Sequence, residues 1–249
     1  HSSDMVALRP AAALEAVAPP ARDNALARAL AQEAGLPVHE LPRTLSTTFD
    51  IDSPADLAIL KLTGYAPGRR LAACLDSFAA DLSPYRRLLP LLTDASRQLF
   101  VAGRVGSHVW RFLERETACR VRLLAEERGL EALGLQATSL LGLYAEAAGL
   151  EELMAALPRL GDGVVLDTRP FLAHWRAPAS RADRFLSDLG YPDGIGEPRL
   201  RRLTVLARAA PIPVLLGGHS LVTGGLMALV RFAWEERDRS GAPSPPEAR

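Results

Sequence analysis

Two acidic residues stand in a pattern that suits the binding of a metal ion. Residues 48–57 read TFDIDSPADL, so Asp50 and Asp52 alternate with two apolar residues. A period of two is typical of a half-buried strand end. Ser53 is a good helix N-cap, and Asp56 stands where a carboxylate can bond back to that cap. The pattern predicts a strand that ends in two carboxylates on one face, where open α/β sheets collect ligands. A strand-to-helix turn with solvated acids is the alternative.

The longer run at residues 46–60, STTFDIDSPADLAIL, resembles the C-terminal signature of MobA-like nucleotidyltransferases. This family includes molybdenum-cofactor and phospholactate guanylyltransferases, in which a D-x-D-[ST]-P-x-D-L segment closes the catalytic sheet. The resemblance covers residues 2–63. It implies strands at 2–10 and 38–42 and a helix at 23–35. It also implies a nucleoside triphosphate substrate and a Mg²⁺ ion. Asp52, with Asp50 in support, would hold this ion near the phosphates of the nucleotide.

The family's glycine-rich nucleotide loop and its mid-domain metal-binding aspartate have no counterpart in these 249 residues. The single lysine, Lys61, comes after the acidic motif. The resemblance therefore implies the C-terminal half of a nucleotidyltransferase domain joined to a second unit. Because that loop and its lysine are missing, we expect these residues alone not to bind nucleoside triphosphates tightly.

Four short apolar runs in the second part of the chain are each followed by small or polar residues. They lie at 99–102, 121–125, 164–166 and 213–216, and longer amphipathic segments separate them. Such alternation predicts βαβ units and a parallel sheet. The carboxyl ends of parallel strands share one edge, so the groups that follow are expected to line one pocket. The candidates are Gly103, Arg104, Gly106, Ser107, His108, Glu126, Asp167, Arg169, Gly217, Gly218, His219 and Ser220.

The glycines after the first run could let backbone N–H groups approach a phosphate, with close helix–strand packing as the alternative for Gly103 and Gly106. Glu126 and Glu127 follow Gly103 at about the spacing of the ribose-binding acid in dinucleotide folds. The glycine pattern differs from G-x-G-x-x-G, however, which argues against a dinucleotide.

The groups after the third and fourth runs could do acid–base chemistry. Asp167 suits a metal or a substrate hydroxyl, and Arg169 suits a carboxylate or phosphate; an ion pair of Asp167 with Arg169 or Arg104 is the alternative. Ser220 or His219 is expected near the N-cap of a helix, where an imidazole stays neutral and can act as a general base. His219 with Asp167 would then form a hydrolase or transferase site, whereas a purely structural cap is the alternative.

Composition excludes several classes of partner. The chain has 29 basic and 29 acidic residues, so no net positive charge attracts nucleic acid or an anionic membrane. The two cysteines form no CxxC or Cys/His cluster, which argues against a zinc site. No apolar run approaches ~18 residues, so we expect a cytoplasmic protein without a membrane span.

These observations predict an α/β chain in four parts. Residues 1–63 would form part of a nucleotidyltransferase sheet, 64–97 a helical bridge, 98–236 an α/β domain with a mostly parallel sheet, and 237–249 a disordered tail. The leading function is nucleotidyl transfer to a small phosphorylated or carboxylated acceptor. A domain that binds an anionic metabolite, or a second-domain site built on His219 and Asp167, is the alternative. The oligomeric state stays open.

Overall fold

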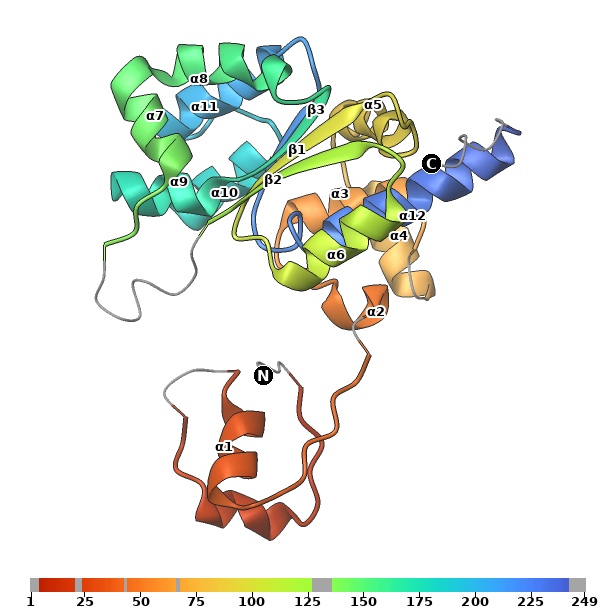
Figure 1. Cartoon of the computed structure of the whole chain (residues 1–249), viewed down its shortest axis with the longest axis vertical. Coiled ribbons are helices and arrows are strands. Elements are labelled where there is room, and N and C mark those ends of the chain that lie inside the picture. The colour runs from red at the N-terminus through yellow and green to blue at the C-terminus, as the bar shows by residue number, and fades with distance from the viewer. Residues whose placement is uncertain (1–4, 21–23, 43, 66–67, 127–135, 242–249) are drawn as a thin grey trace. The chain divides into compact units, whose positions relative to one another are not determined.

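The computed structural model describes residues 5–20, 24–42, 44–65, 68–126 and 136–241 (Figure 1). Two compact units divide the chain, His1–Thr47 and Thr48–Arg249. The first unit holds a 3₁₀ helix, Ala11–Ala16, and helix α1, Leu26–Glu33, which begins later than the helix expected at 23–35. Gly35 follows α1 with a φ of 66°. A short helix, α2 (Leu45–Thr48), runs into the second unit.

Four parallel strands form the sheet of the second unit. They are β1 (Gln98–Gly103), β2 (Arg120–Ala125), β3 (Gly163–Asp167) and β4 (Val214–Gly217), in the order β2-β1-β3-β4. Every neighbouring pair is parallel. The predicted α/β class and the four predicted strands are therefore confirmed.

Helices cover both faces of this sheet (Figure 1). Helices α3, α5, α6 and α12 share one side, with α4 against α3, and α7, α8, α9 and α11 share the other, while α10 packs on β4 and α11. Their bounds are α3 Pro54–Thr63, α4 Arg69–Ser77, α5 Ser83–Leu92, α6 Ser107–Glu116, α7 Leu140–Ala148, α8 Leu150–Ala156, α9 Thr168–Trp175, α10 Arg181–Asp188, α11 Pro198–Ala209 and α12 Gly224–Arg239. A 3₁₀ turn, Leu157–Arg159, follows α8.

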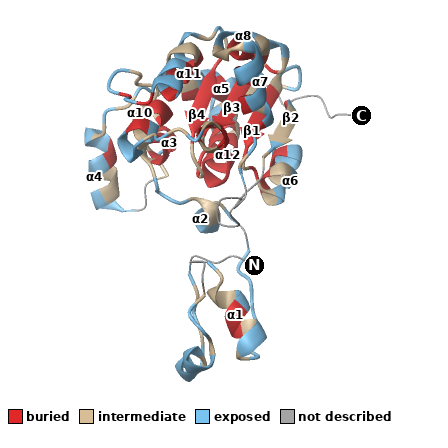
Figure 2. Ribbon diagram, turned by 90° about the vertical axis from the view of Figure 1, so that its left-hand side faces the viewer, coloured by how far each residue is buried: buried red, intermediate tan, exposed pale blue. Residues whose placement is uncertain are grey.

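The core lies on both faces of the central strands, because side chains alternate along a strand. Phe100 and Ala102 of β1 join the cluster beneath α7, α8, α9 and α11. Leu99 and Val101, which alternate with them, are equally buried. Figure 2 shows the buried residues concentrated on β1, β3, β4 and α12. A sheet buried on both faces is what the continuous apolar runs of the sequence predict.

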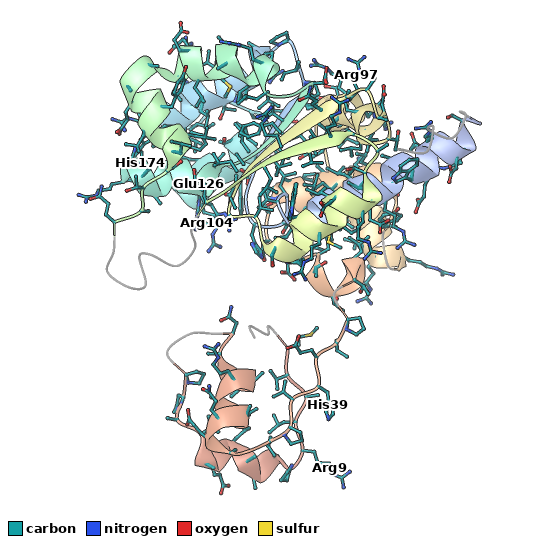
Figure 3. All side chains as sticks on the ribbon, in the orientation of Figure 1. Arg9, His39, Arg97, Arg104, Glu126 and His174 are labelled. Carbon is teal, nitrogen blue, oxygen red and sulfur yellow. The ribbon has the colours of Figure 1, made fainter. Side chains whose placement is uncertain are left out.

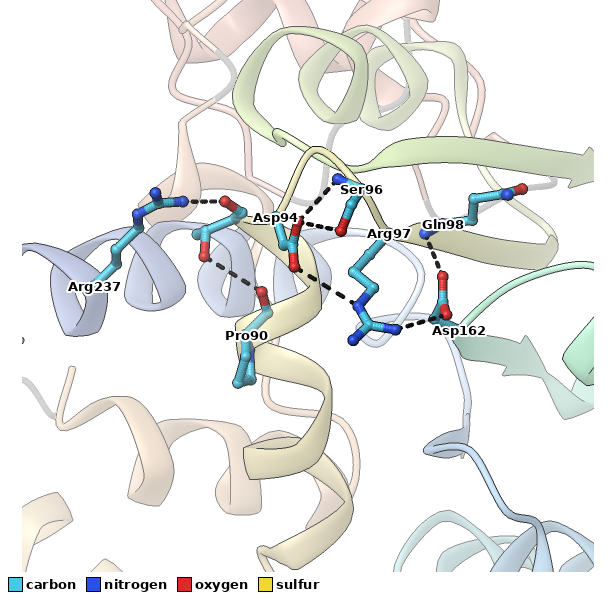
Figure 4. Close-up of polar contacts among 8 residues, drawn as sticks. Pro90, Asp94, Ser96, Arg97, Gln98, Asp162 and Arg237 are labelled. Atoms are coloured by element: carbon cyan, nitrogen blue, oxygen red, sulfur yellow. Dashed lines mark hydrogen bonds and ion pairs between the residues drawn. The ribbon is translucent and has the colours of Figure 1, made fainter. Parts of the chain in front are cut away.

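Polar contacts connect the segments at the amino end of the sheet (Figure 4). The carboxylate of Asp162 accepts the backbone N–H of Gln98 at 2.8 Å and pairs with Arg97 at 3.2 Å. Asp94 accepts both the N–H and the hydroxyl of Ser96, and Arg237 of α12 donates to the carbonyl of Thr93. These contacts lie at the end opposite the predicted ligand edge, so they position β1 and β3 for the site.

Three expected strands are absent from the structure. The described residues at 5–10, 38–42 and 49–52 contain no strand, so the predicted nucleotidyltransferase sheet is not formed there. A strand needs a neighbour to bond its backbone groups, and the described residues before β1 provide none. The prediction of a strand end that turns Asp50 and Asp52 to one face was therefore wrong; both lie in a loop before α3.

The structure divides the chain after Thr47 rather than after residue 63. Helix α3 is buried along most of its length and packs against α12, while α5 packs on β1 and β4 instead of bridging two domains. Helix α12 continues to Arg239, and residues 242–249 of the expected tail lie outside the described residues. Within the described part of the chain, no helix combines the length and apolar character that a bilayer crossing requires.

Candidate functional site at the carboxyl edge of the sheet

The four strands end in one row, which we call the carboxyl edge. Gly103 pairs with Ala125, and Asp167 pairs with Gly217. The register between β1 and β3 sets Ala102 opposite Leu166, so Gly103 and Asp167 end side by side. The chain passes from β1 to β2 on one side and returns to β3 on the other, which makes the β1–β3 border the topological switch point where open α/β sheets bind ligands.

Hydrogen bonds join the strand ends. The carbonyl of Gly103 accepts the N–H of Glu126 at 2.7 Å. The hydroxyl of Thr168 donates to the carbonyl of Gly217 at 3.4 Å. Between them, the N–H of Arg104 donates to Asp167 Oδ2 at 3.0 Å. Hydrogen bonds thus connect the ends of all four strands, with β1 and β3 at the centre of the edge.

Asp167 forms hydrogen bonds and an ion pair with its neighbours. Its carboxylate is buried and accepts two side-chain bonds from Arg169, Nε to Oδ1 at 2.8 Å and Nη2 to Oδ2 at 2.6 Å. It also accepts the N–H of Arg169 at 3.0 Å as the N-cap of α9. The ion pair that the sequence left as an alternative is therefore present. Its two charges largely cancel, so neither residue is presented to a ligand as a lone charge.

The turn after β1 requires glycine for close packing. Gly103 has a φ of 136°, and a Cβ built there would lie 2.1 Å from the Cβ of Asp167. Gly106 is the N-cap of α6 and, as a glycine, has no side chain to bond the first N–H groups of that helix. Ser107, the first helical residue, is exposed, and His108 follows it. The start of α6 thus presents backbone N–H groups and a positive dipole end next to the switch point.

Glu126 belongs to a separate polar network at the end of β2. Its Oε1 accepts the hydroxyl of Ser139 at 2.8 Å, and that serine caps α7. The N–H of Ser139 donates to Nδ1 of the buried His174 at 3.4 Å, and His174 Nε2 lies 3.2 Å from Glu146. Figure 3 labels Glu126, Arg104 and His174. Glu126 therefore connects β2 to α7, and the neighbouring Glu127 lies outside the described residues.

The helix that follows β4 begins later in the chain than the sequence predicted. Helix α12 begins at Gly224 with Thr223 as N-cap, so the prediction that Ser220 or His219 caps it was wrong. A turn at 219–223 intervenes, because the hydroxyl of Thr223 donates to the carbonyl of His219 at 2.8 Å. Gly217 ends β4, and Gly218 follows it directly.

Ser220 links the carboxyl edge to the acidic motif. Its hydroxyl donates to the backbone carbonyl of Asp50 at 2.9 Å. The side chains of Asp50 and Asp52 are exposed, whereas Asp56 is buried. Asp56 Oδ2 accepts the N–H groups of Asp52 and Ser53 at 2.9 and 2.7 Å, which completes the predicted capping box of α3. The motif segment therefore lies beside the end of β4.

Two acids near this edge were not identified as site residues from the sequence. Asp188 ends α10, and its Oδ2 lies 4.0 Å from the position of a Cβ built on Gly218. Burial, followed by the carboxylates of Asp56 and Asp167, raises the pKa of Asp188 to about 7. Burial likewise raises the pKa of Asp56, although bonds from Ser53, Asp52 and Ser220 oppose this. Asp188 sits at the end of an amphipathic helix, where no local pattern marks a functional acid.

The structure thus brings the predicted strand-end residues to one edge but spreads them over three local networks. Arg104, Asp167 and Arg169 form one, Glu126 forms another, and Ser220 joins the loop of Asp50. That all of them line one pocket stays a prediction. Among the described residues, no group of three or more His, Cys, Asp or Glu side chains is arranged to hold a metal ion. Comparisons with protein-family models, curated proteins and solved structures found no match.

Proposed function

We propose that this chain binds a small phosphorylated or carboxylated molecule at the carboxyl edge. The observation that carries the proposal is the position of the α6 N-terminus at the β1–β3 switch point. Gly106 caps α6 without a side-chain bond, and Ser107 is exposed beside it. Such a helix start attracts anions through its N–H groups and dipole. Since Asp167 neutralises Arg169, the backbone supplies most of the attraction.

Inorganic pyrophosphate is a suitable probe, and Ser107→Asp is the variant that tests the site. A carboxylate at the first helical position would occupy the N–H groups and repel the anion, yet it would also stabilise α6. We expect calorimetry to show at least a tenfold loss of pyrophosphate affinity without a loss of stability. Ala182→Asp adds the same charge to the first turn of α10, where the side chain is exposed, and is the matched control.

The proposal fails if the unaltered chain does not bind pyrophosphate, or if Ser107→Asp binds it as well as Ala182→Asp does. Equal losses in both variants would also contradict it, because the effect would then come from overall charge rather than from α6.

Nucleotidyl transfer is a second candidate, favoured by the bond from Ser220 to the Asp50 carbonyl, which sets the acidic loop beside the same edge. Mg²⁺ prefers one or two carboxylates plus substrate phosphates and water. Exposed Asp50 and Asp52 fit that requirement and would hold the ion, which would neutralise the charge of the transferring phosphate.

Asp52→Asn tests this second candidate. We expect it to remove most of the protein's Mg²⁺-dependent turnover of nucleoside triphosphate while the thermal midpoint stays unchanged, because the side chain is exposed. Asp193→Asn, another exposed aspartate, is the control. Normal turnover by Asp52→Asn would exclude the assignment of Asp52.

A further inference from the structure

A pocket of about 190 Å³ runs along the outer edge of β4. It is separate from the α6 N-terminus and does not involve the proposed function. It is lined by the start of α5, the end of α10, the body of α11 and the β4 residues Val214, Leu215 and Leu216. This volume is smaller than that of most drug-sized sites, so the pocket suits a small ligand.

Backbone groups on the outer side of β4, which face away from β3, border this pocket. The N–H of Val164 donates to the carbonyl of Pro213 at 2.9 Å. In a parallel ladder, residues of a strand bond alternately to one side and the other, so Leu215 also bonds to β3. The N–H and C=O groups of Val214 and Leu216 then point outward. Because β4 is an edge strand, no further strand accepts them within the described sheet.

Two buried side chains that line the pocket each have a polar atom without a hydrogen-bond partner among the described residues. Tyr85 of α5 is 3% exposed, and Asp188 of α10 is 8% exposed. Among the described residues, neither the Tyr85 hydroxyl nor Asp188 Oδ1 has a partner. A buried polar group without a bond destabilises the structure, and a ligand that bonds both groups would remove that cost.

The charge around these two groups is negative. Burial raises the pKa of Tyr85, and the carboxylates of Asp188 and Asp56 raise it further. At the outer part of the pocket, Arg87 donates to the carbonyl of Pro211 at 2.8 Å, and Arg208 donates to that of Gly190 at 3.2 Å. Both guanidinium groups are thus bonded to backbone carbonyls at the outer part of the pocket. The carboxylates dominate the charge at its buried end, which therefore favours a cation.

We propose that this pocket binds a small organic cation with a primary ammonium group, held by Asp188, Tyr85 and the outward carbonyls of β4. An ammonium has three donors and no acceptor, which matches a carboxylate, a hydroxyl oxygen and backbone carbonyls. The alkyl part would lie against Leu189, Ile212 and Pro213, which also line the pocket.

Binding should strengthen as the pH rises. The pKa of Asp188 is about 7, so its ionised fraction grows about tenfold between pH 6 and pH 8. An alkylammonium stays charged across this range. The charged and titratable groups that act on Asp188 come from each element packed around it: Asp56 of α3, Tyr85 of α5, Asp167 of β3, Arg169 of α9 and Arg184 of α10 itself.

The test uses n-butylammonium chloride and its neutral counterpart n-butanol, titrated into the full chain at constant ionic strength. Backbone amide NMR signals of Leu215 and Gly190 report on the pocket. We expect saturable shifts with n-butylammonium, a Kd on the order of 1 mM at pH 8, and about tenfold weaker binding at pH 6. We expect n-butanol to bind at least tenfold more weakly than the cation at pH 8.

Asp188→Asn should abolish both the binding and its pH dependence, Tyr85→Phe should weaken it severalfold, and the exposed Asp193→Asn should change nothing. Equal binding of n-butanol, absence of shifts at these amides, or a folded Asp188→Asn variant that still binds would overturn the proposal. If Asp188→Asn does not fold, the wild-type pH profile decides, and a flat profile rejects the proposal.

Discussion

Asp188 and Asp52 are both aspartates near the carboxyl edge, but their different surroundings favour different chemical roles. Asp52 is exposed in a loop, where a carboxylate can meet a hydrated metal ion and a phosphate. Asp188 is buried beside other carboxylates, and a charge there is costly. The residue type alone therefore does not assign a role; burial and neighbouring charges do.

Asp188 should make stability depend on pH. Its folded pKa of about 7 lies above its usual unfolded value near 4, so the folded state keeps a proton that the unfolded state loses between these limits. Its contribution to stability therefore falls as the pH rises from about 4 to 7. Asp188→Asn removes this titration, and we expect the variant to gain about 3 kcal/mol relative to wild type between pH 5 and pH 8.

Urea unfolding at four pH values measures this difference directly. Asp56 also has a raised pKa and stays in both proteins, so only the difference between the two curves isolates Asp188. Parallel curves for the variant and the wild type would show that Asp188 does not hold a proton near neutral pH.

At the scale of helices and strands, the apolar runs predicted the strands correctly, and β1, β3 and β4 are buried on both faces. The runs at 99–102 and 164–166 lie inside β1 and β3. The alternating segment at 49–52 was misleading, because its short-range pattern could not show that no strand pairs with it. The helix start at Ser220 was also misplaced, since the turn at 219–223 depends on contacts with Thr223 that no propensity describes.

The close contact of β1 with β3 predicts a specific cost for enlarging Gly103. Gly103→Ala would place a Cβ 2.1 Å from the Cβ of Asp167 and hold it at a φ that side chains rarely adopt. We expect a loss of more than about 3 kcal/mol, because both strain and the Asp167–Arg169 pair are affected. Gly64→Ala is the matched control: its φ is 70°, but nothing lies within 4 Å of the built Cβ, so about 1 kcal/mol is expected.

Unfolding free energies of both variants in urea provide the comparison. Similar losses for the two would mean that Gly103 matters only through its φ and that the ends of β1 and β3 separate readily. In that case the ends of β1 and β3 would be less tightly packed at the carboxyl edge than the structure indicates.

At the scale of the whole molecule, the two units differ in how much apolar surface they bury. The first unit buries only Ala29 and Leu30 among its described residues, whereas the remaining core residues all follow Thr48. The sequence predicted two units with a boundary after residue 63, which placed the helix at 54–63 in the first unit. Its packing against α12 assigns it to the second unit instead.

This distribution predicts that residues 48–249 fold without the first unit. Because the buried side chains of the sheet and of α3 to α12 all lie after Thr48, a shortened chain that begins there should keep a cooperative urea transition. We expect its unfolding free energy to match that of the full chain within about 1 kcal/mol. The separate segment 1–47 should show no cooperative transition, since so small a unit with two buried apolar residues cannot offset its conformational entropy. A shortened chain that unfolds in a broad transition, or with several kcal/mol less stability, would show that residues before Thr48 complete the core of the α/β unit.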